Sequence, residues 1–326
     1  MSGLWHFAPV FAGLVSVVAV WLLSGPLAGL AMDHPNQRSL HQRPIPRTGG
    51  LGLMLGVVVG WWLSGVRLPL SLWAGALLLV GVSFADDRLD LPAALRFGLH
   101  LVVAGWLAGS LGLDGVWLVL ALLSTGWMTN LYNFMDGADG LAGGMAVIGF
   151  SALAAAFQLQ GESGWALAAV TVAVAAGGFL LFNWPPARVF MGDAGSVPLG
   201  FLAAAFGWLG FAQHLWPVWL PLLLFLPFIA DASVTLLRRG LRGEKVWQAH
   251  REHYYQRLIR MGWSHRRMAL VAWTLMACGA ALALLAWRVP AWRVLAFAWP
   301  LCLAAGMVWT DRRWRAWQAQ ADSATR

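Results

Sequence analysis

The chain has 326 residues, of which 60% are hydrophobic and only 11% are charged. Soluble domains carry about 25% charged residues, so this composition excludes an ordinary soluble protein and indicates an integral membrane protein. The net charge of +8 would suit a nucleic-acid partner, but the distribution of the basic residues along the chain argues against that class.

Apolar runs of a length that suits membrane helices recur along the chain. A helix that crosses a bilayer needs about 17–25 residues. We therefore expect an all-α polytopic membrane bundle of about eleven transmembrane helices, forming a single domain over residues 1–326 with a cytoplasmic tail at 310–326. The predicted spans are Phe7–Leu30, Gly49–Ser64, Pro69–Ala85, Ala94–Leu111, Val116–Thr129, Leu141–Gln158, Gly164–Phe182, Val197–Phe211, Trp216–Leu237, Met268–Ala286 and Val294–Trp309.

The basic residues are divided unequally between the two ends of these spans. Every second loop lies on the same side, and of the 22 Lys and Arg residues only Arg67, Arg288 and Arg293 fall on the other side. The positive-inside rule makes the basic side cytoplasmic and places the N-terminus outside. The basic excess then reflects topology and attraction to anionic membrane lipids. The residues capable of chemistry gather in the same cytoplasmic loops, where we expect the functional site.

The first cytoplasmic loop contains Arg47 just before Gly49-Gly50, the pair that opens the next apolar run. A glycine-rich helix start with a nearby Arg suits phosphate. A positive-inside anchor explains the same arginine equally well.

The second loop is Asp86-Asp87-Arg88-Leu89-Asp90. Adjacent carboxylates repel one another, which raises one pKa unless a cation or an arginine compensates. Asp86 and Asp87 could therefore bind a metal ion or act as a general base. A solvated helix end that Arg88 stabilises is the alternative.

The third loop, from Asn130 to Gly140, joins two apolar runs. In a helix Asn130, Asn133 and Asp136 recur every three residues on one face, and Asp139 continues this spacing. Such oxygen ligands suit a hard cation such as Mg²⁺, which commonly bridges protein to substrate phosphates. A polar loop that caps two helices is the alternative, since Asn and Asp are common caps.

The fourth loop begins with Asn183 and contains Asp193 between Gly192 and Gly195. The functional interpretation of Asp193 is a rigidly held metal-binding carboxylate at a helix start, where backbone amides face an anion. The alternative is a simple N-cap residue.

The fifth loop is the longest and contains His250 and His253, which are three residues apart and would share one helical face. Two histidines without a third ligand on the same element are a weak zinc site, so anion binding together with arginine is the better interpretation. A basic amphipathic helix on the membrane surface is the alternative. Asp231, inside an apolar run, is expected to face the protein interior and to be functional.

Four motifs occur in the same order as in one enzyme family. They are the Asp-Asp-Arg at 86–88, the stretch at 130–140, the run at 183–196 and the histidine segment that ends in Tyr-Gln-Arg-Leu at 258. Together they resemble the polyprenyl-phosphate N-acetylhexosamine-1-phosphate transferases, the WecA/MraY-like membrane enzymes of glycosyltransferase family 4. The family's histidine loop often has His at its first, third and fourth positions, here His250, Glu252 and His253. This departure resembles the O-antigen-initiating branch more than the peptidoglycan branch.

The resemblance implies an activity and its setting. A sugar 1-phosphate would pass from a UDP-N-acetylhexosamine to undecaprenyl phosphate with release of UMP. Mg²⁺ would be the cofactor, with Mn²⁺ as a substitute, and the active site would lie on cytoplasmic loops of a multi-pass protein of the bacterial inner membrane. The donor stays open between UDP-N-acetylglucosamine and a 6-deoxy sugar such as UDP-N-acetylfucosamine. The resemblance also suggests a homodimer and gives no role to nucleic acid.

The resemblance implies residue roles as well. Asp193 would be the principal Mg²⁺ ligand with Asn133 as the second, and Asp86 and Asp87 would orient or deprotonate the lipid phosphate. Asp136 and Asp139 would shape the nucleotide pocket. The remaining predicted substrate-binding residues are Asn183 at the uracil, His250 and His253 at the diphosphate or sugar, Asn130 and Arg47. The alternative function is a lipid-linked sugar flippase or transporter, for which polar residues near the bilayer midplane are expected.

Overall fold

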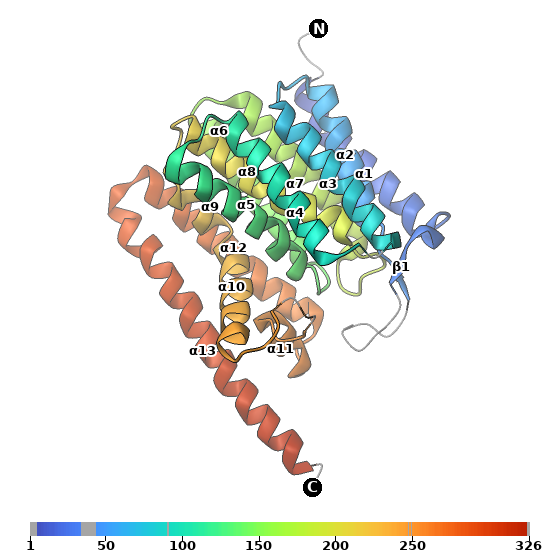
Figure 1. Cartoon of the computed structure of the whole chain (residues 1–326), viewed down its shortest axis with the longest axis vertical. Coiled ribbons are helices and arrows are strands. Elements are labelled where there is room, and N and C mark those ends of the chain that lie inside the picture. Colours follow the sequence, from blue (N-terminus) through green and yellow to red (C-terminus); the bar gives the residue numbers. More distant parts are fainter. Residues whose placement is uncertain (1–4, 34–43, 90, 247, 249, 325–326) are drawn as a thin grey trace.

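The computed structural model describes residues 5–33, 44–89, 91–246, 248 and 250–324. This part of the chain is a helix bundle with one short antiparallel ribbon, β1 (Met32–Asp33) paired with β2 (Ile45–Pro46) (Figure 1). The all-α prediction is confirmed. The helices are η1 (Trp5–Phe7), α1 (Ala8–Ser24), η2 (Ala28–Leu30), α2 (Gly49–Ser64), α3 (Leu70–Leu89), α4 (Ala93–Ser110), α5 (Gly115–Phe134), α6 (Leu141–Leu159), α7 (Ser163–Asn183), α8 (Asp193–Ala212), α9 (Trp219–Leu224), α10 (Leu226–Leu241), α11 (Tyr254–Arg260), α12 (His265–Arg288), η3 (Pro290–Trp292) and α13 (Arg293–Ala324).

The length and composition of the helices indicate a multi-pass membrane protein. Each predicted apolar run lies on one or two of these helices. In the described residues, seven helical segments are long and apolar enough to cross a membrane by themselves, and α2 and α3 contribute shorter apolar segments. The total of eleven spans and the outside N-terminus stay predictions. The seven segments are Trp5–Ser24, Ala93–Ser110, Leu141–Leu159, Ser163–Asn183, Asp193–Ala212, His265–Arg288 and Pro290–Ser323.

One predicted span is wrong, and the predicted tail has a defined secondary structure. The run Trp216–Leu237 is not one helix, because the chain breaks at Phe225 between α9 and α10. Pro227 lies in the first turn of α10, where a missing N–H costs nothing, whereas a continuous helix would lose a hydrogen bond and clash there. The expected tail after Trp309 instead continues α13 as helix to Ala324, since no Pro or Gly interrupts it. The cytoplasmic placement of this segment stays a prediction.

Helix α8 is the buried centre of the bundle. In its apolar segment 94% of the residues are buried. The helix packs against α3 and α5 and makes further contacts with α2 and α6. A Cβ on Gly200 of α8 would collide with the backbone carbonyl of Met128 in α5. Small residues of this kind let helix backbones approach closely in membranes. The N-terminus of α8 is therefore fixed among its neighbours, and that end carries Asp193.

The loops with the polar motifs gather at one end of the bundle, the lower end in Figure 1, beside α10 and α11. Backbone hydrogen bonds join loops that are far apart in sequence. The amide of Gly49 donates to Phe190 O at 3.0 Å, and that of Gly50 donates to Met191 O at 2.8 Å. A Cβ on Gly50 would collide with the backbone of Gly195. The start of α2 therefore lies directly against the start of α8.

Candidate active site

Arg47 and Asp193 are brought together by this contact between the two helix starts. The amide of Phe190 donates to Pro46 O at 2.8 Å. Gly192 has φ of 67°, and a Cβ there would collide with the carbonyl oxygen of Arg47, so this turn requires glycine. As a result Arg47 Nη2 lies 3.3 Å from Asp193 Oδ1.

Arg96, in the first turn of α4, connects Asp193 to the acidic motif of α3. Its Nη1 lies 2.5 Å from Asp86 Oδ2 and 3.9 Å from Asp193 Oδ2. The other oxygen of Asp86 accepts the amide of Leu91 at 2.8 Å, and the Asp86 side chain is only 7% exposed. We call Arg47, Asp86, Arg96 and Asp193 the arginine–carboxylate centre.

The sequence left open whether a cation or an arginine compensates the Asp86-Asp87 pair, and Arg88 was the partner named in the alternative. For Asp86 the described partner is Arg96, which lies ten residues further along the chain. Asp87 is in α3, but its side chain and that of Arg88 lie outside the described part, as does Asp90. The roles predicted for Asp86 and Asp87 at the lipid phosphate stay predictions.

Asn133, at the end of α5, contacts the arginine–carboxylate centre. Its side chain lies beside the Asp193 carboxylate, and its Oδ1 accepts the hydroxyl of Ser196 at 3.3 Å. The structure therefore brings the two predicted metal ligands, Asn133 and Asp193, into direct contact from α5 and α8.

Asp136 adds negative charge beside this contact. Burial raises the pKa of the Asp136 carboxyl well above its usual range, and the charge of Asp193 raises it further, while Arg47 and the amide of Gly192 act in the opposite direction. A like charge close to a buried carboxylate is unfavourable unless a cation compensates it. A cation bound in this region would therefore relieve the repulsion between Asp136 and Asp193.

The donor set fits a hard divalent cation. Asp193 and Asn133 offer carboxylate and amide oxygens, which Mg²⁺ prefers. Within the described residues, no group of three or more His, Cys, Asp and Glu side chains is arranged to hold a metal ion. That finding suits Mg²⁺, because it usually takes one or two protein carboxylates and completes its coordination with water and substrate phosphates.

Asp139 links two loops to the start of a helix. Its Oδ2 accepts the amide of Ala187 at 3.0 Å, and its Oδ1 lies 3.2 Å from Nδ1 of His265, at the start of α12. Asp139 thus shapes the site by holding the α5–α6 and α7–α8 loops against α12. Its predicted place in a nucleotide pocket stays a prediction.

Asn183 and Asn130 also have partners within the protein. Asn183 accepts the amide of Gly140 at 2.8 Å and donates to Val189 O at 2.9 Å, so it clamps the α5–α6 loop to the α7–α8 loop. Asn130 lies one turn before Asn133, and its Nδ2 is 3.2 Å from Nδ1 of His100 in α4. Their predicted substrate contacts stay predictions.

His250 and His253 come together, but not on one helical face as the spacing predicted. Helix α11 begins only at Tyr254, with His253 as its N-cap and His250 in the preceding loop. The two rings nevertheless pack at 4.8 Å between centroids. Burial, together with the neighbouring His253 and Arg239, lowers the pKa of His250 to about 4. His250 is therefore neutral near pH 7 and would meet an anion as a neutral N–H donor.

Tyr255 attaches this histidine segment to the Asn130–Gly140 stretch. Its hydroxyl donates to Phe134 O at 3.0 Å, and a Cβ on Gly137 would collide with the same hydroxyl. The ring of Phe134 lies 6.1 Å from that of His253. The absence of a side chain at Gly137 thus lets α11 lie directly against the stretch that carries Asn133 and Asp136.

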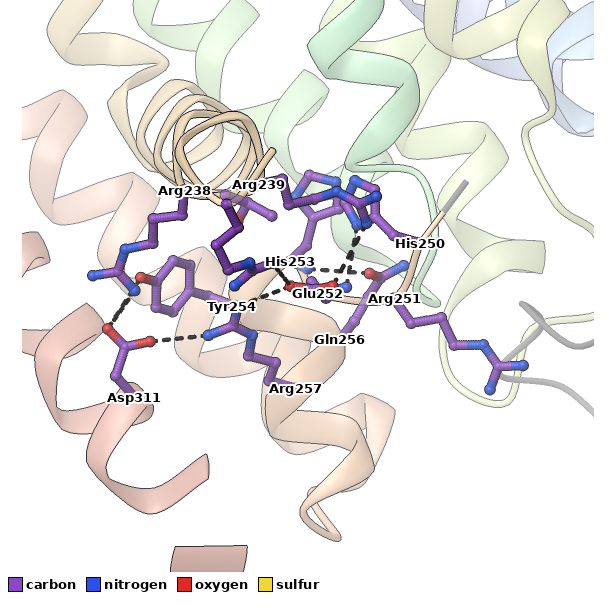
Figure 2. Close-up of polar contacts among 12 residues, drawn as sticks. Arg238, Arg239, His250, Arg251, Glu252, His253, Tyr254, Gln256, Arg257 and Asp311 are labelled. Carbon is purple, nitrogen blue, oxygen red and sulfur yellow. Dashed lines mark hydrogen bonds and ion pairs between the residues drawn. The ribbon is translucent and has the colours of Figure 1, made fainter. Parts of the chain in front are cut away.

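Glu252, at the position where the family often has His, belongs to a group of ion pairs around α11 (Figure 2). It lies 2.5 Å from Arg242 and 3.6 Å from both Arg239 and Arg257. Asp311 of α13 lies 2.5 Å from Arg238 and 2.9 Å from Arg257. We call this group the α11 ion network; its members are Arg238, Arg239, Arg242, Glu244, Glu252, Arg257 and Asp311.

Sequence analysis assigned no role to Arg96, Ser196, His265 or Asp311. The sequence does contain a signal for two of them. Arg96 is a charged residue inside the apolar run Ala94–Leu111, and Asp311 is the one acid next to the basic residues just after the last apolar run. The partners of all four residues depend on contacts across the fold, which residue spacing does not reveal.

Comparisons with known proteins agree with this geometry. Residues 69–210 match the model of glycosyl transferase family 4. A Bacillus subtilis protein named "Probable undecaprenyl-phosphate N-acetylglucosaminyl 1-phosphate transferase" is 32% identical over 289 residues, covering 80% of each chain.

Two further relatives are more distant. The decaprenyl-phosphate N-acetylglucosaminephosphotransferase of Mycobacterium tuberculosis is 29% identical over 321 residues, covering 79% of this chain and 78% of its own. The undecaprenyl-phosphate alpha-N-acetylglucosaminyl 1-phosphate transferase of Escherichia coli K12 is 28% identical over 301 residues, covering 81% and 79%. With the four motifs meeting at one end of a membrane bundle, the chain belongs to glycosyl transferase family 4, among the WecA/MraY-like polyprenyl-phosphate sugar-1-phosphate transferases.

Proposed function

We propose that this protein transfers a sugar 1-phosphate from a UDP-N-acetylhexosamine to undecaprenyl phosphate and releases UMP. The observation that carries the proposal is Arg96, which joins Asp86 of α3 to Asp193 of α8 at the end of a membrane bundle. This arrangement offers guanidinium groups to phosphate oxygens and carboxylates to a cation. The relatives, whose names give the same reaction type, support it.

The reaction has a simple balance of bonds. An oxygen of the lipid phosphate attacks the β-phosphorus of the UDP-sugar and forms a new P–O bond. The bond from that phosphorus to the bridging oxygen breaks, and UMP leaves with the electron pair. Such phosphoryl transfer depends mainly on positioning and on neutralising charge.

The arginines and Asp86 have distinct tasks in this proposal. Arg47 and Arg96 face Asp193, and guanidinium groups bind phosphate oxygens well because their N–H groups form a fixed fork. Asp86 holds Arg96 in place and, with Asp87, orients the lipid phosphate or accepts its proton. His250 and His253 hold the diphosphate or the sugar of the donor.

Asp193 and Asn133 would hold Mg²⁺, with Mn²⁺ as a substitute, since both are hard cations that accept oxygen ligands. When bound, the cation would neutralise charge on the pyrophosphate and stabilise the leaving UMP. Asp136, beside them, adds the negative charge that favours a cation in this region.

The cellular setting follows from the same proposal. The site lies on the cytoplasmic face of the bacterial inner membrane, where the protein forms a homodimer and performs the first membrane step of an O-antigen-like surface glycan. The donor is UDP-N-acetylglucosamine, which the relatives' names favour, or a 6-deoxy analogue such as UDP-N-acetylfucosamine, which the Glu252 departure favours.

The test is UMP release by purified protein in detergent with undecaprenyl phosphate, Mg²⁺ and a panel of UDP-N-acetylhexosamines. We expect release with one donor, loss on adding EDTA and loss in Asp193→Asn. The matched control is Asp114→Asn, the same change at an exposed residue before α5, which should keep full activity. Folded protein that releases no UMP with any donor contradicts the proposal, and lipid movement in liposomes without a donor would indicate a flippase.

A further inference from the structure

Asp231 of α10 is a buried carboxylate to which the proposed reaction gives no role. It is only 6% exposed. Its Oδ1 accepts the amide of Tyr254 at 2.9 Å, and its Oδ2 accepts the amide of Tyr255 at 3.1 Å. These are donors of the first turn of α11, which have no partner within the helix. Asp231 thus fixes where α11 begins and how it is oriented.

The same carboxylate also contacts a histidine ring. Nδ1 of His253 lies 3.2 Å from Asp231 Oδ1, and His253 is only 3% exposed. A carboxylate on one ring nitrogen holds the proton there and leaves the other nitrogen for a different partner. Asp231 therefore sets both the tautomer and the orientation of His253.

His253 in turn defines the place of His250. The two rings pack at 4.8 Å between centroids, and the ring of His253 also lies near those of Phe134 at 6.1 Å and Tyr255 at 5.9 Å. Since Phe134 closes the helix that carries Asn133, a shift of His253 would move His250 relative to the predicted metal ligands.

We propose that Asp231 is a positioning residue for the sugar-nucleotide donor: it holds His253 and the first turn of α11, and through them places His250 at the site. This inference rests on the proposed function. Asp231 acts on the histidine segment and contacts no member of the arginine–carboxylate centre in the described structure, so its effect falls on the donor rather than on the lipid phosphate.

The experiment compares Asp231→Asn, His253→Gln and the double variant, with Asp114→Asn as the matched control. The amide of Asn keeps one acceptor but cannot accept from both backbone amides and the ring as a carboxylate does. In Asp231→Asn we expect KM for the UDP-sugar to rise about tenfold, the effect of one lost charge-assisted hydrogen bond, while KM for undecaprenyl phosphate stays constant. Because both residues act as one unit, the double variant should lose no more than the worse single variant.

A second measurement does not depend on activity. Diethyl pyrocarbonate should modify His253 slowly in the wild-type protein and at least several-fold faster in Asp231→Asn, with the modified residue identified by mass spectrometry. Unchanged labelling of His253, equal rises in the two KM values or multiplying losses in the double variant would overturn the inference. A wild-type protein that releases no UMP would instead refute the proposed function, so the two failures are distinguishable.

Discussion

The arginine–carboxylate centre and the α11 ion network use the same residue types, yet their charge balance differs. In the network each described carboxylate faces at least one arginine, and Glu252 faces three. Beside the centre, burial raises the pKa of the Asp136 carboxyl well above its usual range, and the charge of Asp193 raises it further. Paired charges stabilise a scaffold, whereas unbalanced buried charges mark a site that a ligand completes.

This difference predicts opposite responses to mutation. A change at Asp193 of the centre should remove activity and leave the fold intact, because Asp193 and the neighbouring Asp136 repel one another in the absence of ligands. A change in the network should weaken the fold and leave the activity of the folded molecules nearly unchanged, because its charges depend on one another.

The largest effect is expected for Asp193→Asn. Loss of the principal metal-binding carboxylate should lower kcat/KM about 1,000-fold, equivalent to about 4 kcal/mol. The thermal stability of the metal-free protein should stay level or rise, because the substitution removes a charge that repels Asp136. UMP release and tryptophan-detected unfolding in detergent with EDTA measure both quantities. A large fall in melting temperature that parallels the loss of activity would contradict the prediction, because the centre would then respond to mutation in the same way as the α11 ion network.

Arg96→Met should have the next largest effect. It leaves Asp86, which is 7% exposed, without its arginine, and we expect activity to fall about 100-fold, the loss of about two charge-assisted interactions. Adding Asp86→Asn to this variant should cost little more, since both changes break the same contact. Losses that multiply would show that the two residues act separately.

Asp311→Asn tests whether the α11 ion network stabilises the fold. Arg257, which is 7% exposed, would lose its 2.9 Å partner, and we expect the free energy of unfolding to fall by about 2 kcal/mol. The kcat of the molecules that remain folded should be unchanged. The matched control is Glu244→Gln, a more exposed carboxylate of the same network, which should leave the melting temperature unchanged. An Asp311 variant with normal stability and low kcat would place α13 in the catalytic machinery instead.

Most of the fold could be predicted from the sequence because membrane helices need long apolar runs, and these runs appear directly in the sequence. The sequence also predicted that the motifs gather at one end of the bundle, because successive loops lie on alternate sides of the membrane and the motifs occur in every second loop. The sequence did not predict the break at Phe225, because a proline such as Pro227 is also tolerated within a membrane helix, where neighbouring groups can satisfy the freed backbone groups. Only the observed turn decides between a kink and a break.

The candidate site was predicted less completely, for a physical reason. Asp193 and Asn133 were recognised as residue types that suit Mg²⁺, and the structure places them in contact. Arg96 and Asp231 act on partners 97 and 22 residues away, and no local spacing rule connects such pairs. Tertiary packing alone decides whether a lone charge in an apolar run faces a partner, so the sequence could mark Asp231 but could not name His253.

The smallest predicted effect concerns His250 and pH. Its folded-state pKa is about 4, below the ordinary value of 6.5, so between these values the unfolded chain binds more protons than the folded protein. Stability should therefore fall as the pH drops from about 6.5 towards 4. The contribution is modest, because the half-buried ring is partly screened by water.

The measurement compares melting temperatures in detergent at pH 7.5 and pH 5.0. Wild-type protein should lose more stability on acidification than His250→Gln, which has no imidazole to protonate at this position. His6→Gln, at an exposed histidine near the N-terminus, should retain the wild-type loss. If His250→Gln and wild type respond equally to acid, burial does not keep His250 neutral, and the histidine segment would then carry a positive charge that also binds phosphate.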